Sequence, residues 1–322
     1  MHIDNLAIIS SPFQLLNLKE LIDERNLDKV LIIAIFKNEY DIKKIKAVSN
    51  FTNLKISKWL KSSFLMTHIK LLFIGLKLNK VKNFIFSSLF DNRMLLLSKL
   101  TKYQNIILID DGTEAIAALK SYKDNTNLFD SKLLSILTFF KISFKFPEKI
   151  MFYSSFNSDK EDSKPSYNFI KSKIKHSKTC NDIFFIGQPL YEMLGENFYI
   201  ETLKTFANKN KNKNIKYFPH RLESKENISI INESYGYEIV EPDLIFECYL
   251  ATIDYLPSKI ISFYSTVLFT SPLLLGDRKN KIQIEFISLP KKINQRIPYV
   301  EVVYDALKGH EYIKEYKFHS NE

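Results

Sequence analysis

Short apolar runs alternate with longer amphipathic stretches along the first half of the chain. Each run has the length of a buried strand, and each is followed by a stretch long enough for a helix. Ser11 and Pro12 open the first such helix as the pair typical of an N-cap and a first helical position. This alternation predicts a parallel sheet covered by helices on both faces. The predicted strands lie at residues 5–10, 30–36, 54–59, 83–87 and 105–109.

A second series of the same kind begins after residue 178. A helix is expected from Leu244 to about Asp254, and another opens at Ser265. Between the two series, residues 156–178 are polar and rich in turn-forming residues, which is typical of a linker. The sequence therefore predicts two α/β domains, with the last residues able to return to the first, and two such domains favour a ligand in the cleft between them. The predicted strands of the second series lie at residues 182–186, 214–218, 259–264 and 281–286.

Composition and charge restrict the class of protein. Of the 322 residues, 45% are hydrophobic and 25% are charged, as in globular proteins. The formal net charge of +10 favours an anionic partner, which could be nucleic acid, an anionic membrane face or a sugar nucleotide. The two cysteines lie far apart and no Cys/His spacing resembles a zinc site, so a reducing, cytoplasmic compartment is expected. We recognise no signal peptide and no apolar run of membrane-spanning length, so any contact with the inner membrane is expected to be peripheral.

The stretch 133–146 is apolar and aromatic, with interspersed lysines. Two interpretations are open. It could form a buried helix near the domain junction, or its aromatic and basic residues could face lipid headgroups. Because apolar stretches of soluble proteins are usually buried, we favour the buried helix.

Two carboxylates and a glycine end the apolar run at residues 105–109. Asp110, Asp111 and Gly112 are followed by good helix formers, so they lie where a strand is predicted to lead into a helix. Ligands of open α/β sheets bind at this carboxyl edge, which makes the pair a candidate site. The alternative is a capped turn in which Gly112 takes a positive φ. Ser11 and Gln14 lie at the same kind of edge, and Gln14 could contact an acceptor.

Polar residues also follow the predicted strands of the second series. His220 and Arg221 could donate charge-assisted hydrogen bonds to a phosphate, or they could be an ordinary surface pair. Ser265 and Thr266 could hold an anion at a helix start, or simply cap that helix. Glu247 could bind a ribose diol, or favour the N-terminus of its own helix.

Several common motifs are absent. The sequence contains no Gly-x-Gly-x-x-Gly, no Walker A lysine motif and no Gly-x-Ser-x-Gly elbow. Dinucleotide oxidoreductases, phosphate-loop NTPases and α/β-hydrolases are therefore disfavoured. Asp110 and Asp111 also lack the Asp-x-Asp spacing of metal-dependent sugar transferases, so nothing in the sequence requires a metal or another cofactor.

Taken together, these motifs resemble those of bacterial sialyltransferases of GT-B architecture, which include lipooligosaccharide sialyltransferases, polysialyltransferases and multifunctional marine-type enzymes. The residues 110–112 are similar to the family's acidic-Asp-Gly motif, and Ser265 with Thr266 to its Ser-Ser or Ser-Thr motif. The stretch 246–266, with a Glu before a helix and a Leu-Pro-x-Lys turn, is similar to the donor-site segment. Residues 11–14 resemble the opening of several of these enzymes. The sequence departs from the family's His-Pro motif, because Arg221 follows the histidine.

The resemblance implies two Rossmann-like domains whose parallel sheets face a central cleft. It assigns residues 1–155 to an acceptor-side domain and residues 179–322 to a domain that binds the nucleotide sugar. The implied reaction is a metal-independent, inverting transfer of a nonulosonic acid, such as sialic, pseudaminic or legionaminic acid, from its CMP-activated form to lipooligosaccharide or capsule. Asp111 would be the general base and His220 would stabilise the leaving phosphate. Donor contacts are expected from Glu247, Ser265, Thr266, Arg221, Gly187 and Gln188, and acceptor-side contacts from Ser11, Gln14, Asp110 and Gly112.

Other functions stay open at this point. Within the same architecture, the donor could be CMP-Kdo or a UDP-sugar. A non-catalytic protein that binds nucleic acid or another anion is motivated only by the net charge, and no nucleic-acid-binding module is recognisable. We therefore expect no nucleic-acid partner. A catalytically inactive scaffold of an envelope-glycan pathway is a third alternative.

Overall fold

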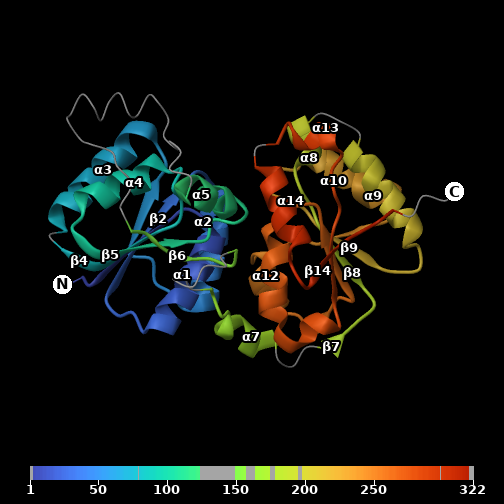
Figure 1. Cartoon of the computed structure of the whole chain (residues 1–322), viewed down its shortest axis with the longest axis horizontal. Coiled ribbons are helices and arrows are strands. Elements are labelled where there is room, and N and C mark those ends of the chain that lie inside the picture. Colours follow the sequence, from blue (N-terminus) through green and yellow to red (C-terminus); the bar gives the residue numbers. More distant parts are fainter. Residues whose placement is uncertain are drawn as a thin grey trace. The chain divides into compact units, whose positions relative to one another are not determined.

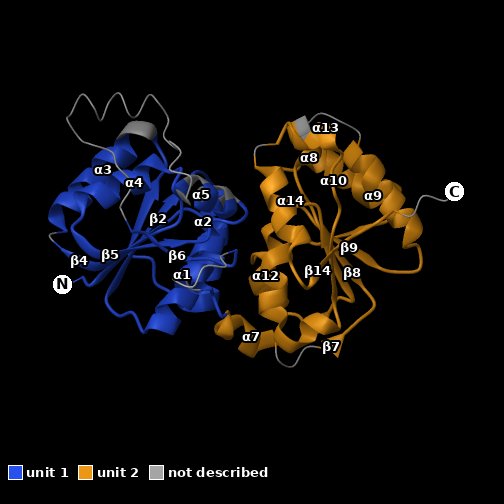
Figure 2. Cartoon of the chain, in the orientation of Figure 1, with its two compact units in different colours: residues 1–166 blue, residues 167–322 orange. Residues whose placement is uncertain are grey.

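The computed structural model describes residues 3–78, 80–123, 149–156, 164–174, 178–194, 198–297 and 299–318. The chain divides into two compact units, Met1–Ser166 and Tyr167–Glu322 (Figure 2). The boundary falls inside the stretch 156–178, for which the sequence predicts a linker, and helix α7 (Asn168–Ile174) lies in the same stretch. The apolar and aromatic positions 133–146 are outside the described residues, so the two interpretations of that stretch stay predictions.

The first unit is built on a parallel sheet of six strands in the order β3-β2-β1-β4-β5-β6 (Figure 1). The strands are β1 (Asn5–Ile9), β2 (Val30–Phe36), β3 (Lys58–Lys61), β4 (Val81–Phe86), β5 (Tyr103–Ile109) and β6 (Met151–Tyr153). The helices between them are α1 (Pro12–Arg25), α2 (Glu39–Thr52), α3 (Phe64–Lys77), α4 (Asn92–Leu100) and α5 (Glu114–Lys123).

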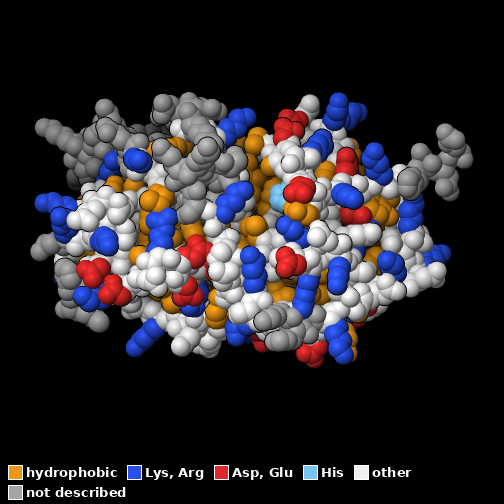
Figure 3. All heavy atoms as spheres, turned by 60° about the horizontal axis from the view of Figure 1, so that its bottom comes forward, with side chains coloured by type: hydrophobic (Ala, Val, Ile, Leu, Met, Phe, Trp, Pro, Cys, Tyr) orange, Lys and Arg blue, Asp and Glu red, His pale blue; other side chains and the backbone are white. Residues whose placement is uncertain are grey.

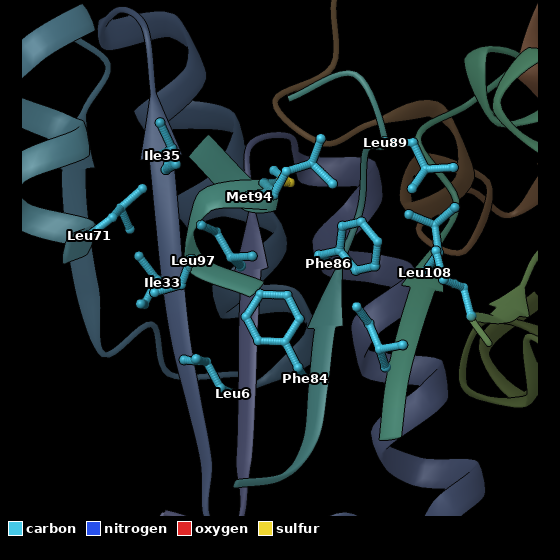
Figure 4. Packing of buried hydrophobic residues seen from close by; sticks show 14 of the residues in the cluster. Leu6, Ile33, Ile35, Leu71, Phe84, Phe86, Leu89, Met94, Leu97 and Leu108 are labelled. Carbon is cyan, nitrogen blue, oxygen red and sulfur yellow. The ribbon is translucent and has the colours of Figure 1, made fainter. Parts of the chain in front are cut away.

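Helices α1 and α2 pack against each other, and so do α3 and α4. Figure 4 shows the core beneath α3 and α4, where Leu71 of α3 and Leu97 of α4 meet side chains of the central strands such as Ile33 and Phe84. All four of these side chains are fully buried. Burial of large aliphatic and aromatic side chains of this kind contributes roughly 1.5–3 kcal/mol each, so this layer fixes the helices on the sheet.

The second unit repeats the same topology. Its sheet has the order β10-β9-β8-β12-β13-β14, again with every neighbour parallel. The strands are β8 (Ile183–Ile186), β9 (Ile215–Phe218), β10 (Glu238–Ile239), β12 (Lys259–Ser262), β13 (Gln283–Phe286) and β14 (Ile313–Glu315), and a small separate sheet pairs β7 (Lys178–Thr179) with β11 (Tyr255–Leu256). The helices are α8 (Leu190–Leu194), α9 (Phe198–Lys209), α10 (Lys225–Tyr235), α11 (Phe246–Leu250), α12 (Thr266–Leu275), α13 (Lys291–Asn294) and α14 (Val300–Lys308), with a 3-10 segment at Gly276–Asn280.

The predicted α/β class with parallel sheets in two Rossmann-like units is confirmed, but some elements differ from the prediction. The third strand lies at Lys58–Lys61 rather than at residues 54–59, and α11 ends at Leu250 rather than near Asp254. The strand at Gln283–Phe286 is not the last one, because β14 follows and pairs with it. Strand β14 therefore extends the second sheet, and the return of the last residues to the first domain stays a prediction.

Candidate functional site

Both sheets reverse their strand order at an equivalent place. In the first unit the reversal lies between β1 and β4, and in the second it lies between β8 and β12. At such a switch point the loops after two neighbouring strands lead in opposite directions and leave a crevice outside the carboxyl ends of the strands, which is where open α/β sheets bind ligands. Apart from Glu247, which lies on α11, the residues predicted from the sequence follow β1 and β5 in the first unit, and β8, β9 and β12 in the second.

Gln14 connects two of the predicted positions in the first unit. Its amide nitrogen donates a hydrogen bond to Oδ1 of Asp111, which lies 97 positions further along the chain. Its amide oxygen accepts from the backbone N–H of Ser10 at 2.5 Å and from that of Ser11 at 3.1 Å. The Ser11 hydroxyl in turn accepts from the Gln14 N–H at 3.2 Å, which completes a capping box at the start of α1. The cap of α1 therefore also orients the Asp111 carboxylate.

The two neighbouring aspartates have different surroundings. Asp110 is 1% exposed, and its Oδ2 accepts a hydrogen bond of 2.6 Å from the backbone N–H of Ser155, just after β6. Burial raises the pKa of Asp110 to about 6, although hydrogen bonds from Ser154 and Ser155 oppose the rise. Asp111 is only partly buried. Of the two carboxyl groups, Asp111 is therefore the one that a ligand at this edge can approach.

Gly112 has φ of 77°, in the left-handed region that favours glycine, and α5 begins two residues later at Glu114. The turn geometry expected for this stretch is thus present. It does not compete with a role in ligand binding, because the same turn carries Asp111 to the edge of the sheet. Four serines that the sequence analysis did not predict as site residues also lie at this edge, after β4 and β6: Ser87, Ser88, Ser154 and Ser155.

In the second unit, Ser265 is the N-cap of α12, a helix of ten residues. Its hydroxyl accepts from the Val267 N–H at 3.3 Å. Thr266 is the first helical residue and is partly exposed. The N–H groups of the first helical turn and the positive end of the helix dipole are directed towards the end of β12, an arrangement that favours an anion.

A buried chain of hydrogen bonds links the ends of β8 and β9. The Gln188 N–H donates to the hydroxyl of Tyr199 at 3.0 Å, and that hydroxyl lies 2.6 Å from the hydroxyl of Tyr217. Tyr217 donates to Oε1 of Glu223, whose Oε2 accepts from the His220 N–H at 2.5 Å. Burial, first of all, and the nearby Glu223 carboxylate raise the pKa of both tyrosines well above the ordinary value, which keeps the hydroxyl groups protonated.

This chain of hydrogen bonds also explains Gly187. A Cβ at this position would lie 2.6 Å from the Tyr217 hydroxyl and would collide with the Glu223 carboxylate. The backbone at Gly187 is held by its own N–H, which donates to the Phe218 carbonyl at 2.8 Å. Glycine is therefore required here for close packing of the turn against the buried network.

One neighbour of His220 indicates the tautomer of its neutral ring. The Leu222 N–H donates to Nδ1 of His220 at 3.3 Å, so Nδ1 acts as an acceptor and the proton of a neutral ring lies on Nε2. His220 is partly exposed and Arg221 is exposed. The imidazole can thus present an N–H donor at the end of β9, beside the turn that contains Gly187 and Gln188.

Glu247 lies deeper than expected for a residue that contacts a ligand directly. It is 4% exposed, and its Oε1 accepts from the Thr270 hydroxyl at 3.1 Å. Burial raises the pKa of this carboxyl above the ordinary value. The hydrogen bond joins α11 to α12, so Glu247 supports the helix that begins beside Ser265.

Two further features concern the described residues as a whole. In the described ranges, no group of three or more His, Cys, Asp or Glu residues is arranged to hold a metal ion. None of the helices in those ranges combines the length and the hydropathy that spanning a bilayer requires.

Comparison with known proteins supports the fold. No protein-family model matches the sequence, and no curated protein matches it either. Among solved structures, MnaA of S. aureus with UDP aligns with a TM-score of 0.52 and 10% identity, covering 95% of this chain and 87% of that one. UDP-GlcNAc 2-epimerase from Neisseria meningitidis, bound to UDP-GlcNAc, gives a TM-score of 0.52 at 9% identity, with coverage of 95% and 91%. The spinosyn forosaminyltransferase SpnP gives 0.50 at 10% identity, with coverage of 99% and 87%. The predicted GT-B architecture is therefore confirmed at the level of the fold.

Proposed function

We propose that this protein is a glycosyltransferase that uses a nucleotide-sugar donor and inverts the configuration of the transferred sugar. The proposal rests on two groups of residues. Hydrogen-bond donors suited to a phosphate follow β9 and β12 of the second unit, and a partly exposed carboxylate, oriented by a hydrogen bond, follows β5 of the first. These groups are Nε2–H of His220, the first turn of α12, and Asp111 held by Gln14. They fit the two halves of a transfer reaction, in which a base activates the acceptor and cations or N–H donors stabilise the leaving group.

In the proposed reaction, a hydroxyl oxygen of the acceptor attacks the anomeric carbon as the bond from that carbon to the donor phosphate breaks. Asp111 takes the proton from the hydroxyl, and the phosphate leaves with the bonding electrons. His220 and the N–H groups at the start of α12 would stabilise the charge that develops on the phosphate. Arg221 would add a cation at the same edge. Asp110, which is buried and bound to the Ser155 N–H, would position Asp111 rather than react.

The proposed donor is a CMP-activated nonulosonic acid. It is supported by the motifs at residues 110–112, 246–266 and 11–14, which resemble those of bacterial sialyltransferases. Such a donor carries both a carboxylate and a phosphate, in keeping with the formal net charge of +10 and with the Lys and Arg side chains spread over the face shown in Figure 3. The proposed acceptor is an anionic surface glycan such as lipooligosaccharide or capsule. Donor contacts would come from Ser265, Thr266 and the turn at Gly187 and Gln188, with Glu247 acting through α12.

A UDP-sugar is the second candidate donor. It is favoured by the solved structures, since one of them is a complex with UDP and another is a complex with UDP-GlcNAc. The same edge of the second sheet could receive the phosphates of either nucleotide. The choice between the two donors therefore depends on recognition of the base and of the sugar.

Isothermal titration with CMP and with UDP distinguishes these donors. We expect binding of CMP that is at least tenfold tighter than binding of UDP, followed by release of CMP when CMP-activated nonulosonic acids are offered together with a surface-glycan acceptor. Binding of UDP without binding of CMP would assign the protein to the second candidate. Binding of neither nucleotide would contradict the proposed function.

A further inference from the structure

Helix α3 carries a continuous apolar stripe on its outer side. Met66, Ile69, Phe73 and Leu76 follow one another at helical spacing, and their exposed fractions are 54%, 39%, 59% and 63%. Residues three or four positions apart lie on the same face of a helix, so these four side chains form one surface, which we call the α3 stripe. Contiguous exposed apolar surfaces of this kind mark binding sites more often than scattered apolar residues do.

The opposite side of α3 is fully used by the fold. Leu71 belongs to the core of the first unit (Figure 4). Gly75 packs so closely against α4 that a Cβ there would lie 2.6 Å from Cβ of Leu100. The buried Thr67 hydroxyl donates to the Lys61 carbonyl at 2.7 Å. The helix is therefore fixed in its rotation about its own axis, and the α3 stripe cannot turn inward without loss of these contacts.

The sequence around the α3 stripe is exclusively basic. From residue 42 to residue 90 the chain contains no Asp, Glu or Arg, while it contains ten lysines. Lys70 and Lys77 are exposed on α3 itself, next to the stripe, and Lys61 and Lys80 are exposed near its two ends. The ten lysines are Lys43, Lys44, Lys46, Lys55, Lys58, Lys61, Lys70, Lys77, Lys80 and Lys82.

The neighbouring helix does not cancel this charge. The first carboxylate after the basic stretch is Asp91, the N-cap of α4. It pairs with Arg93 at 2.5 Å, and both side chains are mostly buried. The combination of an apolar stripe with lysines along its border is typical of helices that lie in the interface of an anionic bilayer.

We propose that the α3 stripe and its lysines dock the first unit on an anionic lipid surface. The four apolar side chains would enter the boundary between headgroups and acyl chains, and the lysines would contact phosphate groups of the lipids. A second copy of the chain is a poorer partner, because two such faces would bring lysines against lysines. A nucleic acid is also a poorer partner, because it would leave the apolar stripe in water.

Docking of this kind would bring the first unit, which carries the candidate base, to the lipid surface. Helix α3 follows β3 directly, so its first turn, which contains Met66, lies at the carboxyl edge of the first sheet. Asp111 follows β5 at the same edge. The proposal about α3 stands without the proposed glycosyl transfer, but if both hold, the acceptor would be attached to the membrane.

Sedimentation of the full chain with lipid vesicles tests the proposal without any nucleotide or acceptor. One set of vesicles contains phosphatidylcholine alone, and the other contains phosphatidylglycerol as well. We expect at least tenfold tighter binding to the anionic vesicles, weakened by added salt. The double variant Phe73→Gln/Leu76→Gln removes apolar surface, and Lys70→Glu/Lys77→Glu reverses charge. Each is expected to weaken binding by about tenfold or more.

Matched changes in the second unit serve as controls. Leu222 is 60% exposed, and Lys211 and Lys213 are exposed. Leu222→Gln and Lys211→Glu/Lys213→Glu are expected to change vesicle binding less than twofold, and all variants should keep the thermal midpoint of the wild type because the altered side chains are exposed. Equal binding to both kinds of vesicle, or an equal loss in the control variants, would overturn the proposal. So would a wild-type dimer in light scattering that the Phe73→Gln/Leu76→Gln variant abolishes.

Discussion

At the scale of single residues, the fold separates two adjacent carboxyl groups into different chemical environments. Asp110 is enclosed at the end of β5 and bound by the Ser155 N–H, whereas Asp111 is partly exposed and bound by the Gln14 amide. The sequence alone identified the pair as a candidate, but it could not supply Gln14 as a partner of Asp111. That contact exists because β1 and β5 both flank β4, an order that no local pattern encodes.

Replacement of Asp111 tests its proposed role as a base. Asp111→Asn keeps the size of the side chain and an oxygen that can accept from Gln14, but it removes the basic carboxylate. We expect turnover to fall by about 10²–10⁴-fold, the usual contribution of a general base. Affinity for CMP, measured by titration calorimetry, should stay within about twofold, since the proposed base contacts the acceptor. Wild-type turnover in this variant would contradict the assignment, and Asp23→Asn on the exposed end of α1 is the control.

Asp110 should make stability depend on pH. Its pKa is about 6 in the folded chain and near the ordinary 3.8 when unfolded, so the folded state binds the proton more tightly. The stabilisation is fully present below pH 4 and is lost as the pH rises through about 6, a difference of about 3 kcal/mol at most. We expect chemical denaturation midpoints of the wild type to fall across this window, and those of Asp110→Asn to fall less. Parallel pH profiles for the two proteins would show that the pKa of Asp110 is not raised.

At the scale of elements, the sequence predicted interior strands better than edge strands. Strand β8 and all of β1 after Asn5 are apolar, and β5 is apolar and buried from Ile106 to Ile109, because both faces of these segments are covered. By contrast, β3 buries only Leu60 and β14 buries only Ile313, so the apolar signal of both strands is weak. Both lie at the edge of a sheet, where charged residues are common.

Two turns of the second unit are connected by a network of buried hydrogen bonds that local sequence patterns did not predict. Tyr199 and Tyr217 look like ordinary core residues in the sequence, and Glu223 looks like a surface residue before a helix. In the structure all three are buried and connect the turn after β8 with the turn after β9. The signal that could have suggested the network is that a buried tyrosine hydroxyl usually needs a hydrogen-bond partner.

Substitution of Glu223 tests whether this network positions the turn that contains His220. Glu223→Gln keeps the shape but replaces one acceptor oxygen by an NH₂ group that faces a donor. Loss of a buried hydrogen bond of this kind costs about 1–3 kcal/mol in the free energy of unfolding. We expect weaker CMP binding as well, because the His220 N–H would lose its acceptor. Glu226→Gln, an exposed change in the first turn of α10, should alter neither quantity. Unchanged stability and unchanged CMP affinity in Glu223→Gln would show that the network does not position the turn that contains His220.

At the scale of the whole molecule, two units with the same strand order present different chemistry at the same edge. The alternation of apolar runs and helices in the sequence predicted the class of fold. It could not predict the order of the strands, because strand pairing depends on contacts between segments far apart in the sequence. In the first unit the edge carries a carboxylate and hydroxyl groups. In the second it carries a histidine, an arginine and a helix N-terminus. We therefore expect anionic nucleotides to bind to the second unit.

Hydrogen–deuterium exchange with and without CMP can locate the nucleotide on the full chain. We expect slower exchange in peptides that contain the turn at Gly187, the segment around His220 and the first turn of α12, because bound phosphate would accept hydrogen bonds there. Peptides around Gln14 and Asp111 should change little with CMP alone, since the proposed base contacts the acceptor. Protection confined to the first unit would reverse the assignment of the two units. In a His220→Gln variant, the side-chain amide can still donate a hydrogen bond, so we expect the same pattern of protection at weaker CMP affinity. His220→Leu should lose most of the protection around residue 220.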